Sequence, residues 1–323
     1  MIEISETVIE NQQLHGEAFP LVLRVSDDKP SFNQSISWIA SNKDTLLTRL
    51  SDHGAILFRG FPVTTDTEFD AFVASFNLSN FTYNESLSNA VRRVRTERVF
   101  TANEAPPSVP IFLHHEMAQT PIYPQKLFFF CEQADMVGGE TPICRSDVLL
   151  ERLQKEAPSF VKSCEQKGLR YSNVMPAEND AASGQGRSWQ STLTAATASQ
   201  AEEKLAALNY EWQWLRDGSL KVTTPVLSSI KTLNNGKRVF FNQLIAALLG
   251  WRDARNQAEK SVFFGDGSQF NMQEIDVLIR ISDELTFNLQ WQKGDVALLD
   301  NFLVMHGRKP YSGQRRVLAS LIA

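Results

Sequence analysis

The segment FLHHEMAQTP, residues 112–121, contains two of the five histidines of the chain and a glutamate directly after them. If residues 112–117 are extended, their side chains alternate between two faces, so His114 and Glu116 point one way and His115 points the other way. Imidazole nitrogens and carboxylate oxygens are common metal ligands. Because such a pair also occurs often by chance, it needs a third ligand before it indicates a metal site.

His306 is the candidate for the third ligand, because it follows the apolar, strand-like run FLVM and would lie at a strand end. Two histidines and one carboxylate leave three coordination positions open, which is the arrangement of non-haem Fe(II) oxygenases. The same ligand types also suit zinc, so the ligands alone do not determine the metal. A zinc- or iron-dependent hydrolase or isomerase on a cupin-like barrel therefore remains an alternative.

Two adjacent arginines in QRRVLASL, residues 314–321, provide a second indication. In a strand, Arg316, Leu318 and Ser320 share one face, and Arg315 lies on the other face. A guanidinium donates two parallel hydrogen bonds to a carboxylate. The far carboxylate of 2-oxoglutarate requires such a partner, while the keto-acid end of that molecule chelates iron. We expect one of the two arginines to face the metal and the other to be solvated.

Four motifs resemble, in their order along the chain, those of the taurine dioxygenase / clavaminate synthase-like family. They are His114-x-Glu116, the GGET segment at 138–141, His306, and Arg316 ten positions after it. The resemblance spans roughly residues 50–322. It implies a double-stranded β-helix, or jelly-roll, core and a dioxygenase that uses Fe(II), 2-oxoglutarate and O₂. The implied roles are metal ligation by His114, Glu116 and His306 and 2-oxoglutarate binding by Thr141 and Arg316.

The reaction implied by the resemblance couples decarboxylation of 2-oxoglutarate to hydroxylation or desaturation of an unactivated C–H bond. Related halogenases have a small residue at the position of Glu116, so the carboxylate argues against halogenation. A non-enzymatic sensor of 2-oxoglutarate is a further alternative, which production of succinate would exclude.

The nearest branch of the family resembles plant clavaminate synthase-like proteins and the hydroxylase of syringomycin assembly. It implies an amino-acid-like substrate, free or tethered to a carrier protein, in specialised metabolism such as antibiotic biosynthesis. Ser320 stands where sulfonate- or carboxylate-binding members often have a second arginine. A sulfonate is therefore not expected. Either another residue such as Arg187 pairs a substrate carboxylate, or that carboxylate is masked as a thioester or amide.

The candidate residues for substrate contact come from two sources. One is the family resemblance, and the other is the loop-like segment 177–188, which is either a binding loop or plain surface. In the RVFFNQ run, the phenylalanine and the asparagine resemble pocket residues of the family. The candidate residues are Asn103, Arg187, Phe240, Asn242 and Ser320.

The composition indicates a water-soluble cytoplasmic protein. The chain has 323 residues, 42% of them hydrophobic, and a net charge of −5, which gives no reason to expect nucleic acid or a membrane surface as partner. The start of the chain is acidic rather than basic, unlike a signal peptide. The cysteines, Cys131, Cys144 and Cys164, are odd in number and lack metal-type spacing, so we expect reduced thiols.

Short runs rich in β-branched and aromatic residues predict strands, and they outnumber the expected helices. The expected strands are 54–61, 126–133, 169–175, 238–243, 286–292, 295–301 and 315–322, with a hairpin over 211–224. Helical spacing predicts helices over 64–76, 146–158, 199–209 and 271–285. We therefore expect a β-dominated α+β fold in a single domain over residues 1–323, with residues 1–50 as an N-terminal extension packed on the core.

Overall fold

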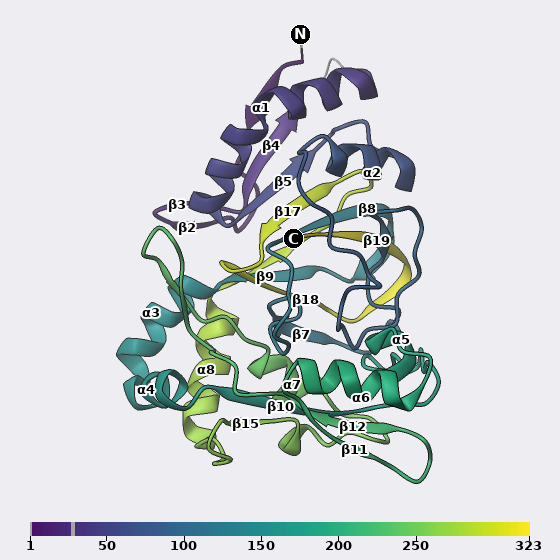
Figure 1. The fold of residues 1–323 in the computed structure, drawn as a ribbon. Coiled ribbons are helices and arrows are strands. Elements are labelled where there is room, and N and C mark those ends of the chain that lie inside the picture. The colour runs from purple at the N-terminus through teal and green to yellow at the C-terminus, as the bar shows by residue number, and fades with distance from the viewer. Residues whose placement is uncertain (1, 27–29) are drawn as a thin grey trace.

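The core of the protein consists of two β-sheets packed face to face, with helices outside them (Figure 1). The computed structural model describes residues 2–26 and 30–323. The larger sheet contains, in spatial order, β1 (Ile4–Glu6), β4 (Leu21–Val25), β5 (Ala55–Arg59), β17 (Val296–Asp300), β8 (Lys126–Gly138), β19 (Tyr311–Ile322) and β6 (Phe100–Thr101). The facing sheet contains β16 (Thr286–Leu289), β9 (Thr141–Arg145), β18 (Val304–Arg308) and β7 (Ile111–His114).

Alternating side chains of the larger sheet form two separate cores. Along β8, Leu127, Phe129 and Cys131 pack inward against the facing sheet, whereas Phe128 and Phe130 pack outward against helices. Both sets are apolar because this strand is buried on its two faces. Neighbouring strands pair antiparallel throughout both sheets, except that β4 and β5 are parallel. The predicted β-dominated α+β class is confirmed.

Helix α1 (Phe32–His53) and helix α2 (Asp66–Ala74) cover the outer face of the larger sheet. Helix α2 was expected from its phenylalanine spacing, but α1 was not predicted. Its buried apolar side chains are only Ile39, Leu46 and Leu50, on a helix of 22 residues that is otherwise largely polar. The apolar stripe is therefore too sparse to stand out in the sequence.

A second layer packs below the facing sheet, as Figure 1 shows. It contains α3 (Ser146–Glu156), α4 (Pro158–Lys167), α7 (Leu244–Gly250), α8 (Met272–Glu284) and a sheet ordered β11 (Glu211–Trp214), β12 (Leu220–Thr223), β10 (Leu169–Met175) and β15 (Val262–Phe264). The smaller elements are β2 (Gln13–His15), β3 (Glu17–Phe19), α5 (Trp189–Leu193), α6 (Ala198–Ala207), β13 (Lys231–Thr232), β14 (Arg238–Val239) and the 3₁₀ turn η1 (Ala258–Lys260).

The predicted helices at 146–158, 199–209 and 271–285 and the hairpin at 211–224 are confirmed within a few residues. The strand expected over 238–243 is wrong beyond Val239, because the chain turns there into α7. Within the described parts of the chain, no helix has the length and apolar character needed to cross a membrane.

Candidate active site

A cavity between the two core sheets brings together the three predicted metal ligands. His114 ends β7 and lies directly opposite His306 on the paired strand β18, with ring centres 4.3 Å apart. One ligand atom from each of His114, Glu116 and His306 lies within 4.8 Å of the others. The antiparallel register of β7 and β18 therefore makes one site from residues far apart in the sequence.

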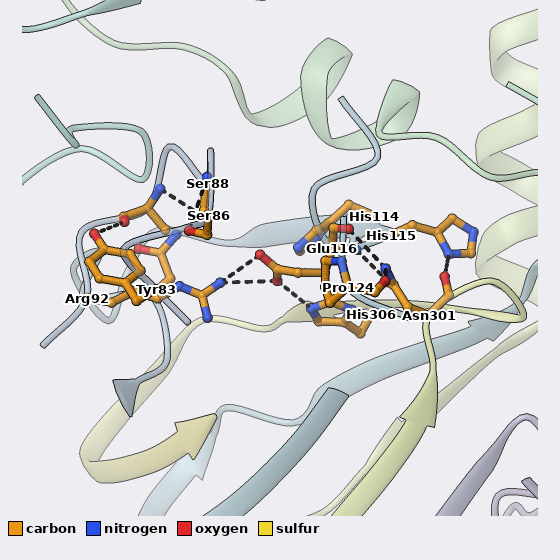
Figure 2. Close-up of polar contacts among 12 residues, drawn as sticks. Tyr83, Ser86, Ser88, Arg92, His114, His115, Glu116, Pro124, Asn301 and His306 are labelled. Atoms are coloured by element: carbon orange, nitrogen blue, oxygen red, sulfur yellow. Dashed lines mark hydrogen bonds and ion pairs between the residues drawn. The ribbon is translucent and has the colours of Figure 1, made fainter. Parts of the chain in front are cut away.

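Glu116 reaches this site through a turn rather than through strand alternation. Strand β7 ends at His114, and Met117 has a φ of 59°, so the expected extended conformation over 112–117 is wrong after His114. Asn301 fixes the turn, since its side-chain oxygen accepts a hydrogen bond from the Glu116 amide at 2.8 Å and its Nδ2 donates to the Glu116 carbonyl at 3.0 Å (Figure 2). Asn301 was not expected to have this role.

His115 lies with its ring directed away from the Glu116 carboxylate. It is completely buried, and its two ring nitrogens face the carbonyl oxygens of Asn301 and Phe240. Burial lowers the pKa of His115 to about 3, so the ring is neutral and donates to one of the two carbonyls. Its surroundings are those of a structural histidine.

The protonation states of His114 and Glu116 suit a divalent metal ion. Burial, with a smaller contribution from His306, lowers the pKa of His114 to about 4. Its Nδ1 donates to the Phe112 carbonyl at 2.8 Å, which leaves the Nε2 lone pair free for a metal. Burial would raise the pKa of Glu116, but Arg92 and the two histidines more than offset this and hold the pKa below its usual range. Two imidazoles and a carboxylate fit Fe(II).

Arg315, rather than Arg316, faces the cavity. The Arg315 Nε donates to the Gly139 carbonyl at 2.8 Å, and its Nη2 donates to the Thr141 hydroxyl at 3.2 Å. The Arg316 side chain is 54% exposed and pairs with Glu132 at 3.0 Å. The prediction that Arg316 contacts 2-oxoglutarate is therefore wrong in its choice of face, and Arg315 is the arginine beside Thr141.

Strand alternation along β19 was correct, but the inner face was assigned to the wrong set of residues. Val317 and Ala319 pack in the core between the sheets, whereas Leu318 packs against the outer helices. Arg315 belongs to the inner set. Burial, with a smaller contribution from Arg308, lowers the pKa of Arg315 to about 10, so the guanidinium stays charged at neutral pH.

Thr141 lies at the bottom of this arginine subsite and is 4% exposed. Its hydroxyl also accepts a hydrogen bond from Trp291 Nε1 at 2.9 Å, a contact that the sequence did not suggest. Gly139 in the GGET segment has a φ of +75°, and a Cβ there would lie 2.9 Å from the Arg315 side chain. The glycine thus leaves room for the arginine to lie against the backbone.

The predicted substrate residues have different locations. Asn103 lines the cavity, and its Nδ2 donates to the Gly184 carbonyl at 3.1 Å. Gly184 and Gln185, from the loop-like segment 177–188, also line it, so part of this segment is a wall of the site. Phe240, Asn242 and Ser320 are buried away from the cavity lining, because the chain at 240–242 packs inward before α7 and Ser320 lies on the outer face of β19.

Arg187 is also outside the cavity lining, where it holds the segment 83–88 in place. It is 1% exposed, and its guanidinium donates to oxygens of Tyr83, Ser86, Ser88 and Ser191 at 2.8–3.4 Å. Its Cζ lies 3.9 Å from the centre of the Tyr83 ring. The prediction that Arg187 contacts substrate is wrong, because all three of its nitrogens are used by the protein.

The Arg187→Met variant is expected to unfold more easily, by about 3 kcal/mol, because it leaves several buried oxygens without donors. Urea unfolding followed by circular dichroism measures the change. Arg252→Met is the matched control, since the Arg252 side chain is 68% exposed, and it should change stability by less than about 0.5 kcal/mol. Equal stabilities of the two variants would contradict this role for Arg187.

Sequence reasoning missed several cavity residues because they are spread over several segments and belong to no recognisable motif. Arg92 is the main one, since its Nη2 lies 3.0 and 3.1 Å from the two Glu116 carboxylate oxygens (Figure 2). Others that line the cavity are Asn89, Gln119, Gln185, Gln243 and Arg308. The RRVR run at 92–95 contains a visible cluster of basic residues, but nothing in it indicates which side chain faces inward.

Comparison with known proteins agrees with the fold and the site. Residues 17–321 match the family described as taurine catabolism dioxygenase TauD, TfdA family. A clavaminate synthase-like protein of Arabidopsis thaliana is 38% identical over 322 residues, covering 96% of each chain. The dapdiamide synthesis protein DdaC of Enterobacter agglomerans is 30% identical over 290 residues, covering 84% of this chain and 83% of that protein.

Among solved structures, the PvcB protein of Pseudomonas aeruginosa is similar in fold, with a TM-score of 0.57 at 14% identity. The alignment covers 99% of this chain and 91% of that one. The predicted double-stranded β-helix is therefore confirmed. The chain belongs to the TauD/TfdA family of Fe(II)- and 2-oxoglutarate-dependent dioxygenases.

Proposed function

We propose that this dioxygenase hydroxylates or desaturates an unactivated C–H bond of a small amino-acid-like molecule, free or presented on a carrier protein. In this proposal His114, Glu116 and His306 bind the iron. Arg315 and Thr141 bind the far carboxylate of 2-oxoglutarate. The observation that carries the proposal is that the three ligands and the Arg315–Thr141 pair line one cavity.

The protein groups have separate tasks in this reaction. Bound Fe(II) supplies the chemistry of O₂ with 2-oxoglutarate. Arg315 neutralises a buried carboxylate, and Trp291 orients the Thr141 hydroxyl by donating to it. Phe129 and Val317 give the cavity an apolar side that limits access of water to the reacting centre.

The names of two similar proteins support a role in specialised metabolism. DdaC is a dapdiamide synthesis protein, and a PvcB structure is described as an oxygenase from an isonitrile synthetic pathway. We extend this to the present chain as a proposal, in which the product belongs to a biosynthetic pathway of the same general kind.

The test is to supply Fe(II), 2-oxoglutarate and O₂ together with free amino acids, their amides and carrier-bound amino acids. We expect succinate to form in step with a product whose mass increases by one oxygen or decreases by two hydrogens. A hydrolase or isomerase would form product without succinate, and a sensor would form neither. Efficient turnover of taurine with no amino-acid form accepted would contradict the proposed substrate class.

A further inference from the structure

Arg92 is the one arginine lining the cavity whose nitrogens the described residues leave largely unused. Its side chain is 7% exposed, and a single nitrogen, Nη2, contacts Glu116. The Arg92 Nε is buried with no hydrogen-bond partner in the described parts of the chain. Its guanidinium also lies over the Phe100 ring, with Cζ 5.2 Å from the ring centre, which fixes its direction.

Each of the other two arginines of the cavity donates to protein oxygens through two nitrogens, although the Arg308 Nε, like that of Arg92, is buried with no partner among the described residues. Arg308 donates through Nη1 and Nη2 to four backbone carbonyls, those of Asn103, Ala105, Pro106 and Val109, at 2.7–3.3 Å. Arg315 contacts Gly139 and Thr141 and belongs to the proposed 2-oxoglutarate subsite. Among the described residues that line the cavity, Arg92 alone combines an uncommitted donor with direct contact to a metal ligand.

The charges lining the cavity leave an excess of positive charge. The lining contains three arginines, Arg92, Arg308 and Arg315, and one carboxylate, Glu116. The two positive charges of Fe(II) and the two negative charges of 2-oxoglutarate cancel, so loading the site does not remove the excess. When Glu116 binds a metal ion, its carboxylate interacts with the ion as well as with Arg92. The carboxylate then neutralises the Arg92 charge less completely. A buried guanidinium in this position favours another anion.

The cavity lining also contains polar, uncharged side chains. Asn89, Gln119 and Gln185 each line the cavity and are 9%, 5% and 6% exposed. Asn89 Nδ2 and the side-chain oxygens of the two glutamines have no hydrogen-bond partner among the residues described. The two glutamine oxygens are acceptors and suit a donor group of the substrate, whereas the Asn89 NH₂ is an uncharged donor and binds a carboxylate less strongly than a guanidinium does.

We propose that Arg92 is a specificity-determining residue that pairs with the free carboxylate of the oxidised substrate. The inference rests on the proposed function, and it deepens that function by favouring a free acid over a thioester or amide. Arg92 thus supplies, from a different segment, a second cavity arginine that the inner face of β19 does not provide, since Val317, Ala319 and Leu321 follow Arg315 there. The unpaired amides of the same cavity would bind the uncharged polar end of the same molecule.

Propionate and its neutral isostere propionamide test this subsite without knowledge of the natural substrate. The protein is loaded with Mn(II) and excess 2-oxoglutarate, and the paramagnetic relaxation of the methyl protons of each probe is measured. We expect propionate to relax at least about fivefold faster than propionamide in the wild type, because charge-assisted pairing holds it near the metal. The variant Arg92→Gln should abolish the difference, and Arg92→Lys should keep part of it.

The matched control is Arg93→Gln, because the Arg93 side chain is adjacent in sequence but 77% exposed. It should behave as the wild type. Equal relaxation of the two probes in the wild type would overturn the proposal, and so would a preference for propionate that survives in Arg92→Gln. The second result would mean that the probe binds the metal directly.

Mn(II) affinity, measured by water-proton relaxation, separates this role from simple positioning of Glu116. We expect Arg92→Gln to retain Mn(II) affinity within about tenfold, the low end of the effect of a residue that contacts a metal ligand. If it lost Mn(II) as completely as Glu116→Ala does, Arg92 would be a positioning residue and the proposal would be wrong. Succinate formation by the Fe(II)-loaded wild type tests the proposed function separately.

Discussion

The His306→Ala variant is expected to lose its metal ion, and with it all formation of succinate, while the fold stays intact. His306 and His114 are paired across β18 and β7, so removal of either imidazole leaves two ligands for the ion. We expect metal affinity to fall by more than about 100-fold, beyond the effect of losing a group that only supports a ligand. Metal content after dialysis measures the loss, and far-ultraviolet circular dichroism measures the fold.

His115→Ala is the matched control for this prediction. His115 lies next to His114, but both of its ring nitrogens face backbone carbonyls. The substitution should therefore reduce stability by about 1–3 kcal/mol, through an unpaired carbonyl and a small cavity, and leave appreciable metal affinity. If His115→Ala abolished metal binding and His306→Ala did not, the assignment of ligands would be wrong.

The Arg315→Leu variant is expected to weaken 2-oxoglutarate binding by about 2–5 kcal/mol, because it leaves a buried carboxylate without its charged partner. Arg316→Leu should change the affinity little. Its side chain is 54% exposed and its ion pair with Glu132 is near the surface, where such pairs contribute about 0–1 kcal/mol. Calorimetric titration of the Mn(II)-loaded protein with 2-oxoglutarate measures both variants.

Arg315 and Arg316 thus serve as controls for each other, because they are adjacent in the sequence but lie on opposite faces of β19. Equal losses of affinity, or a larger loss in Arg316→Leu, would contradict the assignment of Arg315. Thr141→Val should have a smaller effect, about 1–3 kcal/mol for one hydrogen bond to a charged group. Because Thr141 also accepts from Trp291, Trp291→Phe is expected to weaken binding less than Thr141→Val.

The candidate ligand set and the type of fold could be predicted from the sequence. Histidine and glutamate are among the few side chains that bind iron, so His114, Glu116 and His306 could be selected from five histidines and a short list of neighbouring carboxylates. Strands such as β8 and β17 were predictable because β-branched and aromatic runs bounded by turn residues are local properties. The helix α8 was predictable for a similar reason, since its buried positions recur with helical spacing.

Which face of each element lines the cavity depends on tertiary packing and could not be predicted. Strand alternation separates Arg315 from Arg316, but it gives two equivalent sets, and packing of Val317 and Ala319 between the sheets selects the set of Arg315. The turn that directs Glu116 depends on Asn301, which is 185 positions away in the chain.

Arg92 is a comparable case, since its contact with Glu116 joins an irregular segment to the turn after β7. Its neighbours Arg93 and Arg95 have the same side chain but pair with acidic residues outside the cavity. Residue type and spacing report local conformation and possible chemistry. The direction of an irregular segment is set by non-local packing and hydrogen bonds, such as those of Arg187 to residues 83–88. No local pattern in the sequence can therefore predict that direction.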